Sequence, residues 1–96
     1  MLSGRLRPLK GRSLVAWNLR RLRTERGLTQ VELAAEANVD HVYVGELERE
    51  VGNATVDFLD RLAKSLKVPI AELLREPATG EKRPRALKSG RKPSSA

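Results

Sequence analysis

Residues 28–48, LTQVELAAEANVDHVYVGELE, predict two short helices joined by a tight turn. Thr29 can cap the first helix, and Glu32, three residues later, completes the pattern in which each side chain bonds the other residue's backbone amide. Asn38 stands where the chain must reverse, and asparagine tolerates the left-handed backbone conformation that a sharp turn requires. Asp40 can then cap the second helix. The spacing leaves no room for more than a turn between the helices, so it predicts a helix-turn-helix arrangement.

Apolar residues at helical spacing predict three further helices around this pair. The first covers residues 13–26 and ends at Gly27, a residue suited to the left-handed end of a helix. Another covers residues 56–66, and Pro69 opens a fifth, short helix because proline fits the first helical position. The residues expected to point inward from this last helix are Ile70, Leu73 and Leu74. The predicted fold class is therefore all-α, a compact five-helix domain.

Net charge divides the chain of 96 residues into three parts. Residues 1–12 carry a net charge of +4, residues 13–76 carry −2 and residues 77–96 carry +5. Both ends are rich in proline, glycine, serine and basic residues and poor in large apolar ones, which is typical of disordered segments. We expect one folded domain at 13–76, flanked by a disordered basic N-terminal arm and a disordered basic C-terminal tail. These tails then supply all of the net positive charge.

Composition argues against several classes of protein. The chain has no cysteine and one histidine, which leaves neither a thiolate site nor a cluster of metal ligands. No apolar run reaches the length of a membrane span, and the N-terminus lacks the apolar stretch of a signal peptide. No Ser/His/Asp set, glycine-rich phosphate loop or pair of buried carboxylates indicates catalysis. We therefore expect a non-enzymatic, cytoplasmic protein that has no metal, no cofactor, no membrane contact and no small-molecule ligand.

Four sequence features occur together in one pattern. They are LRRLRTERGLTQVELA at 19–34, the triplet Ala34, Asn38 and Val44, LER at 47–49, and FLDRLAKSLKVPIAELL at 58–74. Joined in this order, they resemble the Cro and phage-repressor (XRE-type) helix-turn-helix family over residues 13–76. The resemblance implies a lambda-repressor-like domain in which one helix of the pair braces on the DNA backbone and the other lies in the major groove. Double-stranded DNA is therefore the expected partner.

The resemblance implies that the start and outer face of the third helix read base edges. The corresponding residues are Asp40, His41, Val42, Gly45 and Glu46. His41 can donate to guanine or phosphate, Val42 offers methyl contact to thymine, and Glu46 can accept from the amino group of cytosine. The alternative is that Asp40 is only a helix cap and Glu46 only part of a solvated face.

The same resemblance assigns residues to the DNA backbone and to the scaffold of the domain. The expected phosphate contacts are Thr29, Gln30, Tyr43 and Asn53, with Thr29 acting mainly as a cap. Gln30 would also buttress the third helix. A buried salt bridge between Arg23 and Glu48 is implied as well, whereas Arg20 is expected to be solvated.

We predict a sequence-specific transcription regulator of bacterial or phage type, a repressor or autoregulator acting at the nucleoid. It would bind as a homodimer to a palindrome whose half-sites lie about one helical turn apart. Leu73 and Leu74 are the candidates to cross the dimer interface. One alternative is an antitoxin that binds a toxin partner through the tails or through Trp17, which lies off the apolar stripe and is expected at the surface. The other is an adaptor that has kept the fold and lost affinity for DNA, which the acidic core would allow.

Overall fold

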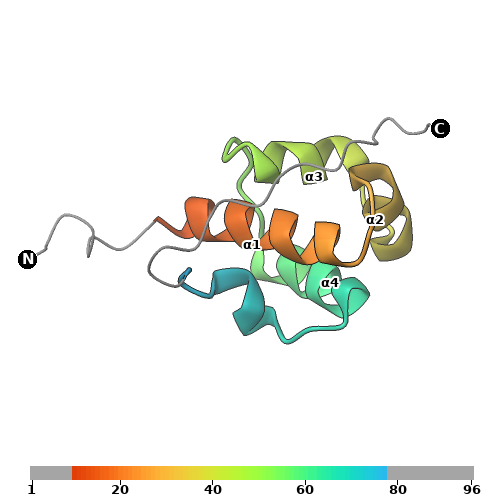
Figure 1. The fold of residues 1–96 in the computed structure, drawn as a ribbon. Coiled ribbons are helices and arrows are strands. Elements are labelled where there is room, and N and C mark those ends of the chain that lie inside the picture. The colour runs from red at the N-terminus through yellow and green to blue at the C-terminus, as the bar shows by residue number, and fades with distance from the viewer. Residues whose placement is uncertain (1–9, 78–96) are drawn as a thin grey trace, which may run out of the picture.

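The computed structural model describes residues 10–77, and the regular elements in that range are all helical (Figure 1). In chain order they are α1 (Gly11–Glu25), α2 (Gln30–Ala37), α3 (His41–Glu48), α4 (Val56–Leu66) and the 3₁₀-helix η2 (Ile70–Leu74). The all-α class is confirmed for these residues. Most of the two basic tails, residues 1–9 and 78–96, lies outside the described range, so the disorder expected there stays a prediction.

The fifth element differs from the prediction. Ile70–Leu74 forms a 3₁₀-helix of 5 residues rather than a fifth α-helix. Arg75 follows in an extended conformation with φ −69° and ψ 134°, which ends the segment before two full 3₁₀ turns, and 3₁₀-helices are found mainly as short pieces of this kind. Residues 10–77 therefore contain four α-helices, and one 3₁₀-helix closes the domain.

Local hydrogen bonds define the helix-turn-helix pair. The Thr29 hydroxyl accepts from the Glu32 amide at 3.0 Å, and the Glu32 carboxylate accepts from the Thr29 amide at 2.9 Å, which confirms the predicted capping box. Asn38 ends α2 in the left-handed conformation, with φ 59° and ψ 50°. The Asp40 carboxylate then accepts from the Val42 amide at 2.9 Å and starts α3. The chemistry of single residues thus decides where α2 ends and where α3 begins.

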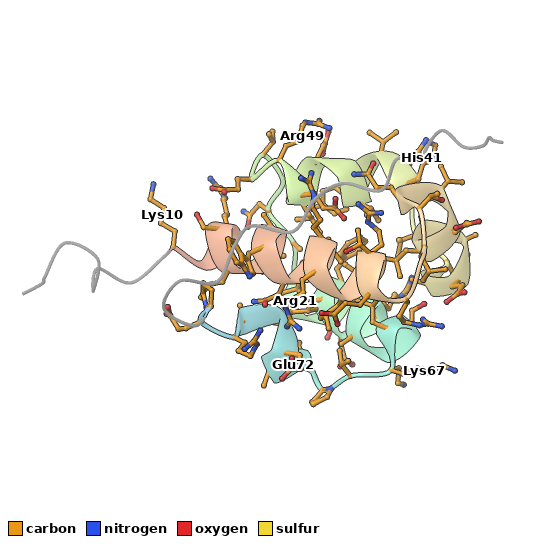
Figure 2. All side chains as sticks on the ribbon, viewed as in Figure 1. Lys10, Arg21, His41, Arg49, Lys67 and Glu72 are labelled. Carbon is orange, nitrogen blue, oxygen red and sulfur yellow. The ribbon has the colours of Figure 1, made fainter. Side chains whose placement is uncertain are left out.

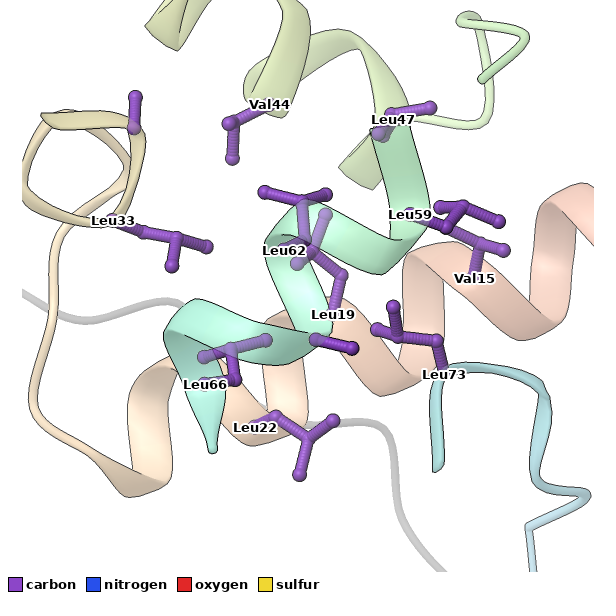
Figure 3. Packing of buried hydrophobic residues seen from close by; sticks show 12 residues of the cluster. Val15, Leu19, Leu22, Leu33, Val44, Leu47, Leu59, Leu62, Leu66 and Leu73 are labelled. Atoms are coloured by element: carbon purple, nitrogen blue, oxygen red, sulfur yellow. The ribbon is translucent and has the colours of Figure 1, made fainter. Parts of the chain in front are cut away.

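The hydrophobic core lies between α1, α4 and the α2–α3 pair, and η2 closes it on one side (Figure 3). One completely buried aliphatic side chain comes from each of the five elements. In chain order these are Leu19, Leu33, Val44, Leu62 and Leu73. Burying such a side chain contributes about 1.5–3 kcal/mol relative to leaving it in water. The position of α3 on the domain is therefore fixed from inside by the same core that holds the other helices.

The two leucines proposed for a dimer interface have opposite environments. Leu73 is completely buried in the core and cannot contact a second chain, so its assignment to the interface is wrong. Leu74, expected to face inward, is instead 44% exposed and remains a surface candidate. The 3₁₀ geometry explains both results, because residues three apart overlap in such a helix and Leu73 therefore continues the inward side that Ile70 begins.

A buried polar side chain ties η2 to α1. Asn18 lies in α1 and is completely buried. Its side-chain amide donates to the carbonyl oxygen of Leu73 at 3.2 Å and to that of Arg75 at 2.8 Å. Two backbone acceptors near the end of η2, where the last carbonyls of a helix have no partner within it, are thus satisfied by α1. The neighbouring Trp17, expected at the surface, is half-buried.

We predict that Asn18→Ala lowers the free energy of unfolding by about 2–4 kcal/mol, because a buried and a partly buried carbonyl oxygen would lose their donor. Urea denaturation followed by circular dichroism measures this loss. Ser13→Ala is the matched control, since it removes an exposed hydrogen bond of 2.8 Å to Glu50 and should change stability by less than about 0.5 kcal/mol. Equal effects of the two substitutions would contradict the role of Asn18 as the anchor of η2.

Candidate nucleic-acid interface

The outer side of α3 forms an accessible surface on the domain. Asp40, His41 and Val42 are all exposed at its start, Val42 to 54%. In Figure 2, His41 and Arg49 are labelled at the two ends of α3, on the edge of the molecule that faces away from α1. The three residues expected to read bases at the start of α3 are therefore accessible. Asp40 also caps α3, as the alternative interpretation of this residue proposed.

Gly45 does not belong to the reading surface. It is buried, and a Cβ atom at this position would lie 3.2 Å from Oε1 of Gln30 and 3.4 Å from Nη1 of Arg49. The bare backbone of Gly45 leaves room for the side-chain ends of Gln30 and Arg49. Because residue 45 is buried beneath them, its assignment as a base-reading residue is wrong. Glu46, one residue further, is half-buried and keeps part of its surface toward solvent.

Tyr43 is already engaged within the domain. Its hydroxyl donates to the carbonyl oxygen of Asn53 at 2.7 Å, and its ring meets the Phe58 ring edge-on with 4.7 Å between centroids. A phenol has one proton, so this hydroxyl cannot also donate to a phosphate, as we had expected. The side chain of Asn53 is exposed and makes no hydrogen bond within residues 10–77, which keeps it available as a phosphate contact. Thr29 is half-buried and serves as the α2 cap.

A buried carboxylate joins the three helices behind the reading surface. Glu48 accepts from Nε and Nη2 of Arg23 at 2.6 and 2.8 Å, which confirms the expected salt bridge. It also accepts from Nε of Arg20 at 3.2 Å and from Nε2 of Gln30 at 3.1 Å. Gln30 thus buttresses α3 as predicted, whereas Arg20 is an ion-pair partner rather than a solvated side chain. Arg23 further donates to the carbonyl oxygen of Leu28 at 2.7 Å, between α1 and α2.

These donors determine the protonation of Glu48. Burial alone would raise the pKa of this carboxyl group, because a low-dielectric surrounding disfavours its charged form. The hydrogen bonds and positive charge of Arg23, followed by the hydrogen bonds from Gln30 and Arg20, outweigh this effect and hold the pKa below its ordinary value of 4.5. Glu48 is therefore an anion in the folded domain at neutral pH.

The described residues also bear on membrane and metal sites. Among residues 10–77, no helix is long and apolar enough to cross a bilayer. The same residues contain no group of three or more histidine, cysteine, aspartate or glutamate side chains arranged to hold a metal ion.

Comparison with known proteins relates this surface to described relatives. A helix-turn-helix family model matches residues 19–73. An uncharacterized HTH-type transcriptional regulator, y4dJ of Sinorhizobium fredii, is 44% identical over 63 residues, which cover 66% of this chain and 82% of the relative. The immunity repressor protein of Bacillus phage phi105 is 32% identical over 62 residues, 65% of this chain and 43% of the relative. The crystal structure of the restriction-modification controller protein C.AhdI from Aeromonas hydrophila superposes with a TM-score of 0.63 and 35% identity, covering 65% of this chain and 94% of that structure.

We predict that Glu48→Gln lowers the free energy of unfolding by about 3–5 kcal/mol, because Arg23 would stay buried without a counter-charge. Urea denaturation at neutral pH measures the loss. Glu36→Gln is the matched control: its carboxylate is 45% exposed and lies 3.5 Å from Arg26, so we expect a change of less than about 1 kcal/mol. A cost for Glu48→Gln as small as that of the control would contradict the anchoring role of Glu48.

The depressed pKa of Glu48 also predicts how this difference depends on pH. A carboxyl group with a lowered pKa in the folded state contributes its full stability above the unfolded-state pKa and loses it as the pH falls through the folded value. The difference in unfolding free energy between wild type and Glu48→Gln should therefore stay constant well above pH 4.5 and shrink below it. A difference that grows in acid would contradict the assigned direction of the shift.

Proposed function

Because this chain belongs to the helix-turn-helix family HTH_3, we propose that it regulates transcription by reading a palindromic DNA operator as a homodimer. The family and the relatives are DNA-binding transcription regulators, and the chain is a regulator of this kind rather than an enzyme. We propose in addition that its operator is a palindrome, that it binds as a homodimer, and that it represses transcription. One relative is an immunity repressor, and repression or autoregulation is accordingly the sign that we propose here.

One observation supports direct reading of bases: the start of α3 is exposed while its opposite side is fixed by buried contacts. His41 and Val42 stand at solvent, whereas Val44 and Glu48 of the same helix are buried in the core and in the ion-pair network. A helix held rigidly from one side and open on the other fits the major groove, which admits an α-helix. In this arrangement His41 would donate to guanine or phosphate, and Val42 would contact the methyl group of thymine.

The homodimer that we propose would use the surface around Leu74. This side chain is exposed and borders a cavity of about 230 Å³ that Val15 and Leu59 also line. Val51 and Val56 are further large apolar side chains exposed on the domain, to 62% and 71%. Association of two copies would place two α3 helices on one face of the DNA, which requires half-sites about one helical turn apart.

Selection from a random pool of DNA duplexes by the full chain, at near-physiological salt, tests the proposed function. We expect enrichment of a palindrome whose half-sites are spaced by one helical turn. Enrichment of a single half-site would contradict the dimer, and the absence of any enriched sequence would contradict sequence-specific reading. In the latter case, a protein-binding role, as antitoxin or adaptor, becomes the better explanation.

We further predict that His41→Ala weakens binding to the enriched duplex by about tenfold, since one specific base contact contributes about 1–3 kcal/mol. Fluorescence anisotropy with enriched and scrambled duplexes measures the loss. The free energy of unfolding should stay within about 0.5 kcal/mol, because His41 is exposed. Lys67→Gln, on the side of the domain away from α3 (Figure 2), is the control and should leave specific binding unchanged. Equal affinities of His41→Ala and wild type would contradict the assigned reading surface.

A further inference from the structure

Arg49 is an isolated positive charge in an acidic part of the domain. It is the only lysine or arginine between Arg26 and Arg61, a stretch that contains the whole helix-turn-helix pair and the loop that follows it. The same stretch carries eight aspartate and glutamate residues. A protein surface that approaches DNA normally presents several basic side chains to the phosphates. In the helix-turn-helix pair and its loop, one guanidinium has to fill this role.

The structure leaves this guanidinium uncommitted. Arg49 is exposed and forms no ion pair or hydrogen bond through its side chain within residues 10–77. Its neighbour Glu50 accepts instead from the Ser13 hydroxyl at 2.8 Å. The side chain of Arg49 therefore has no partner among residues 10–77, whereas Arg20 and Arg23 are held by the buried carboxylate of Glu48.

Gly45 determines where the Arg49 side chain lies. A Cβ atom at Gly45 would meet Gln30 Oε1 at 3.2 Å and Arg49 Nη1 at 3.4 Å, so both side chains fold over the bare backbone of this glycine. Gln30 is the first residue of α2, the helix that crosses the DNA backbone in a helix-turn-helix. Arg49 Nη1 is thus brought beside the start of α2 although Arg49 itself follows the end of α3.

We propose that Arg49, laid over Gly45 beside Gln30, binds a phosphate of the DNA backbone and supplies most of the salt-dependent affinity of the helix-turn-helix pair. This inference rests on the proposed function. A phosphate is the favoured target rather than a base, because His41, at the base-reading end of α3, lies eight residues away, about 12 Å along a helix. A guanidinium also matches the geometry of phosphate oxygens and keeps its charge at all relevant pH values.

Arg49→Gln and Arg49→Lys in the full chain test the proposal. Affinity is measured by fluorescence anisotropy from about 50 to 200 mM salt, on a random-sequence duplex and on the duplex enriched by selection. We expect Arg49→Gln to weaken binding to both duplexes by about tenfold and to reduce the slope of log affinity against log salt by about 0.9. Arg49→Lys should keep that slope, because the charge stays. Lys67→Gln is the matched control, since it removes an exposed positive charge on the side away from α3, and it should leave the slope unchanged.

Three results would overturn this inference. The first is an unchanged salt slope for Arg49→Gln, and the second is an equal loss of slope for Lys67→Gln. The third is a loss confined to the enriched duplex, which would assign Arg49 to a base edge. Circular dichroism verifies that each variant is folded. If His41→Ala weakens specific binding while Arg49→Gln has no effect, only the Arg49 inference fails. If no duplex is enriched by wild type, the proposed function fails, and the random duplex still tests the Arg49 contact.

Discussion

The carboxylate of Glu48 is the constraint on which the arrangement of the domain depends. It lies at the end of α3, is buried, and accepts four hydrogen bonds from Arg20 and Arg23 of α1 and Gln30 of α2. Removing such a charge from water costs several kcal/mol, which good geometry and complete hydrogen bonding can offset. The network is therefore better understood as a device that fixes geometry than as a source of stability. The apolar core holds α3 against the domain, and the four directed bonds of Glu48 add a specific orientation relative to α1 and α2.

This fixed orientation explains why the same residues serve structure and recognition. Gln30 donates to Glu48 and also lies over Gly45, where it meets the side chain of Arg49. The bare backbone of Gly45 leaves room for these two side-chain ends, although a glycine within a helix costs about 0.5–1 kcal/mol relative to alanine. Gly45 therefore lowers the stability of α3 at the position where the side chains of Gln30 and Arg49 meet. This local loss of stability is consistent with a role of Gly45 in placing Arg49 beside Gln30 at the surface.

Most features that depend on neighbours in sequence were predicted correctly. Among the tertiary contacts, the Arg23–Glu48 salt bridge and the contact of Gln30 with Glu48 were expected only because the pattern resembles a known family. The capping box of Thr29 and the left-handed turn at Asn38 follow from local hydrogen bonds and backbone sterics, so the pattern of residues sufficed. The burial of Asn18 could not be foreseen, because the two η2-side carbonyl oxygens that it binds lie more than 50 residues later in the chain. The predictions for three other residues were wrong for the same reason. Arg20 pairs with Glu48, the hydroxyl of Tyr43 is used within the domain, and Gly45 is buried. The environment of each of these residues depends on side chains and carbonyl groups from other segments, and the periodicity of apolar residues does not predict such contacts.

The charge around α3 indicates how affinity and discrimination would be divided if the proposed function holds. Asp40 and Glu46 place negative charge at the reading surface, where phosphates repel it, and Arg49 is the only lysine or arginine between Arg26 and Arg61. A surface of this kind binds unspecific DNA weakly, because unspecific affinity comes almost entirely from cations that neutralise phosphates. The correct base contacts then account for a larger share of the total binding free energy, which raises the ratio of specific to unspecific affinity. The reading surface would therefore favour discrimination. Beyond the contact proposed for Arg49, general attraction to DNA would come from basic residues outside 13–76, where the net charge of the chain is positive at both ends.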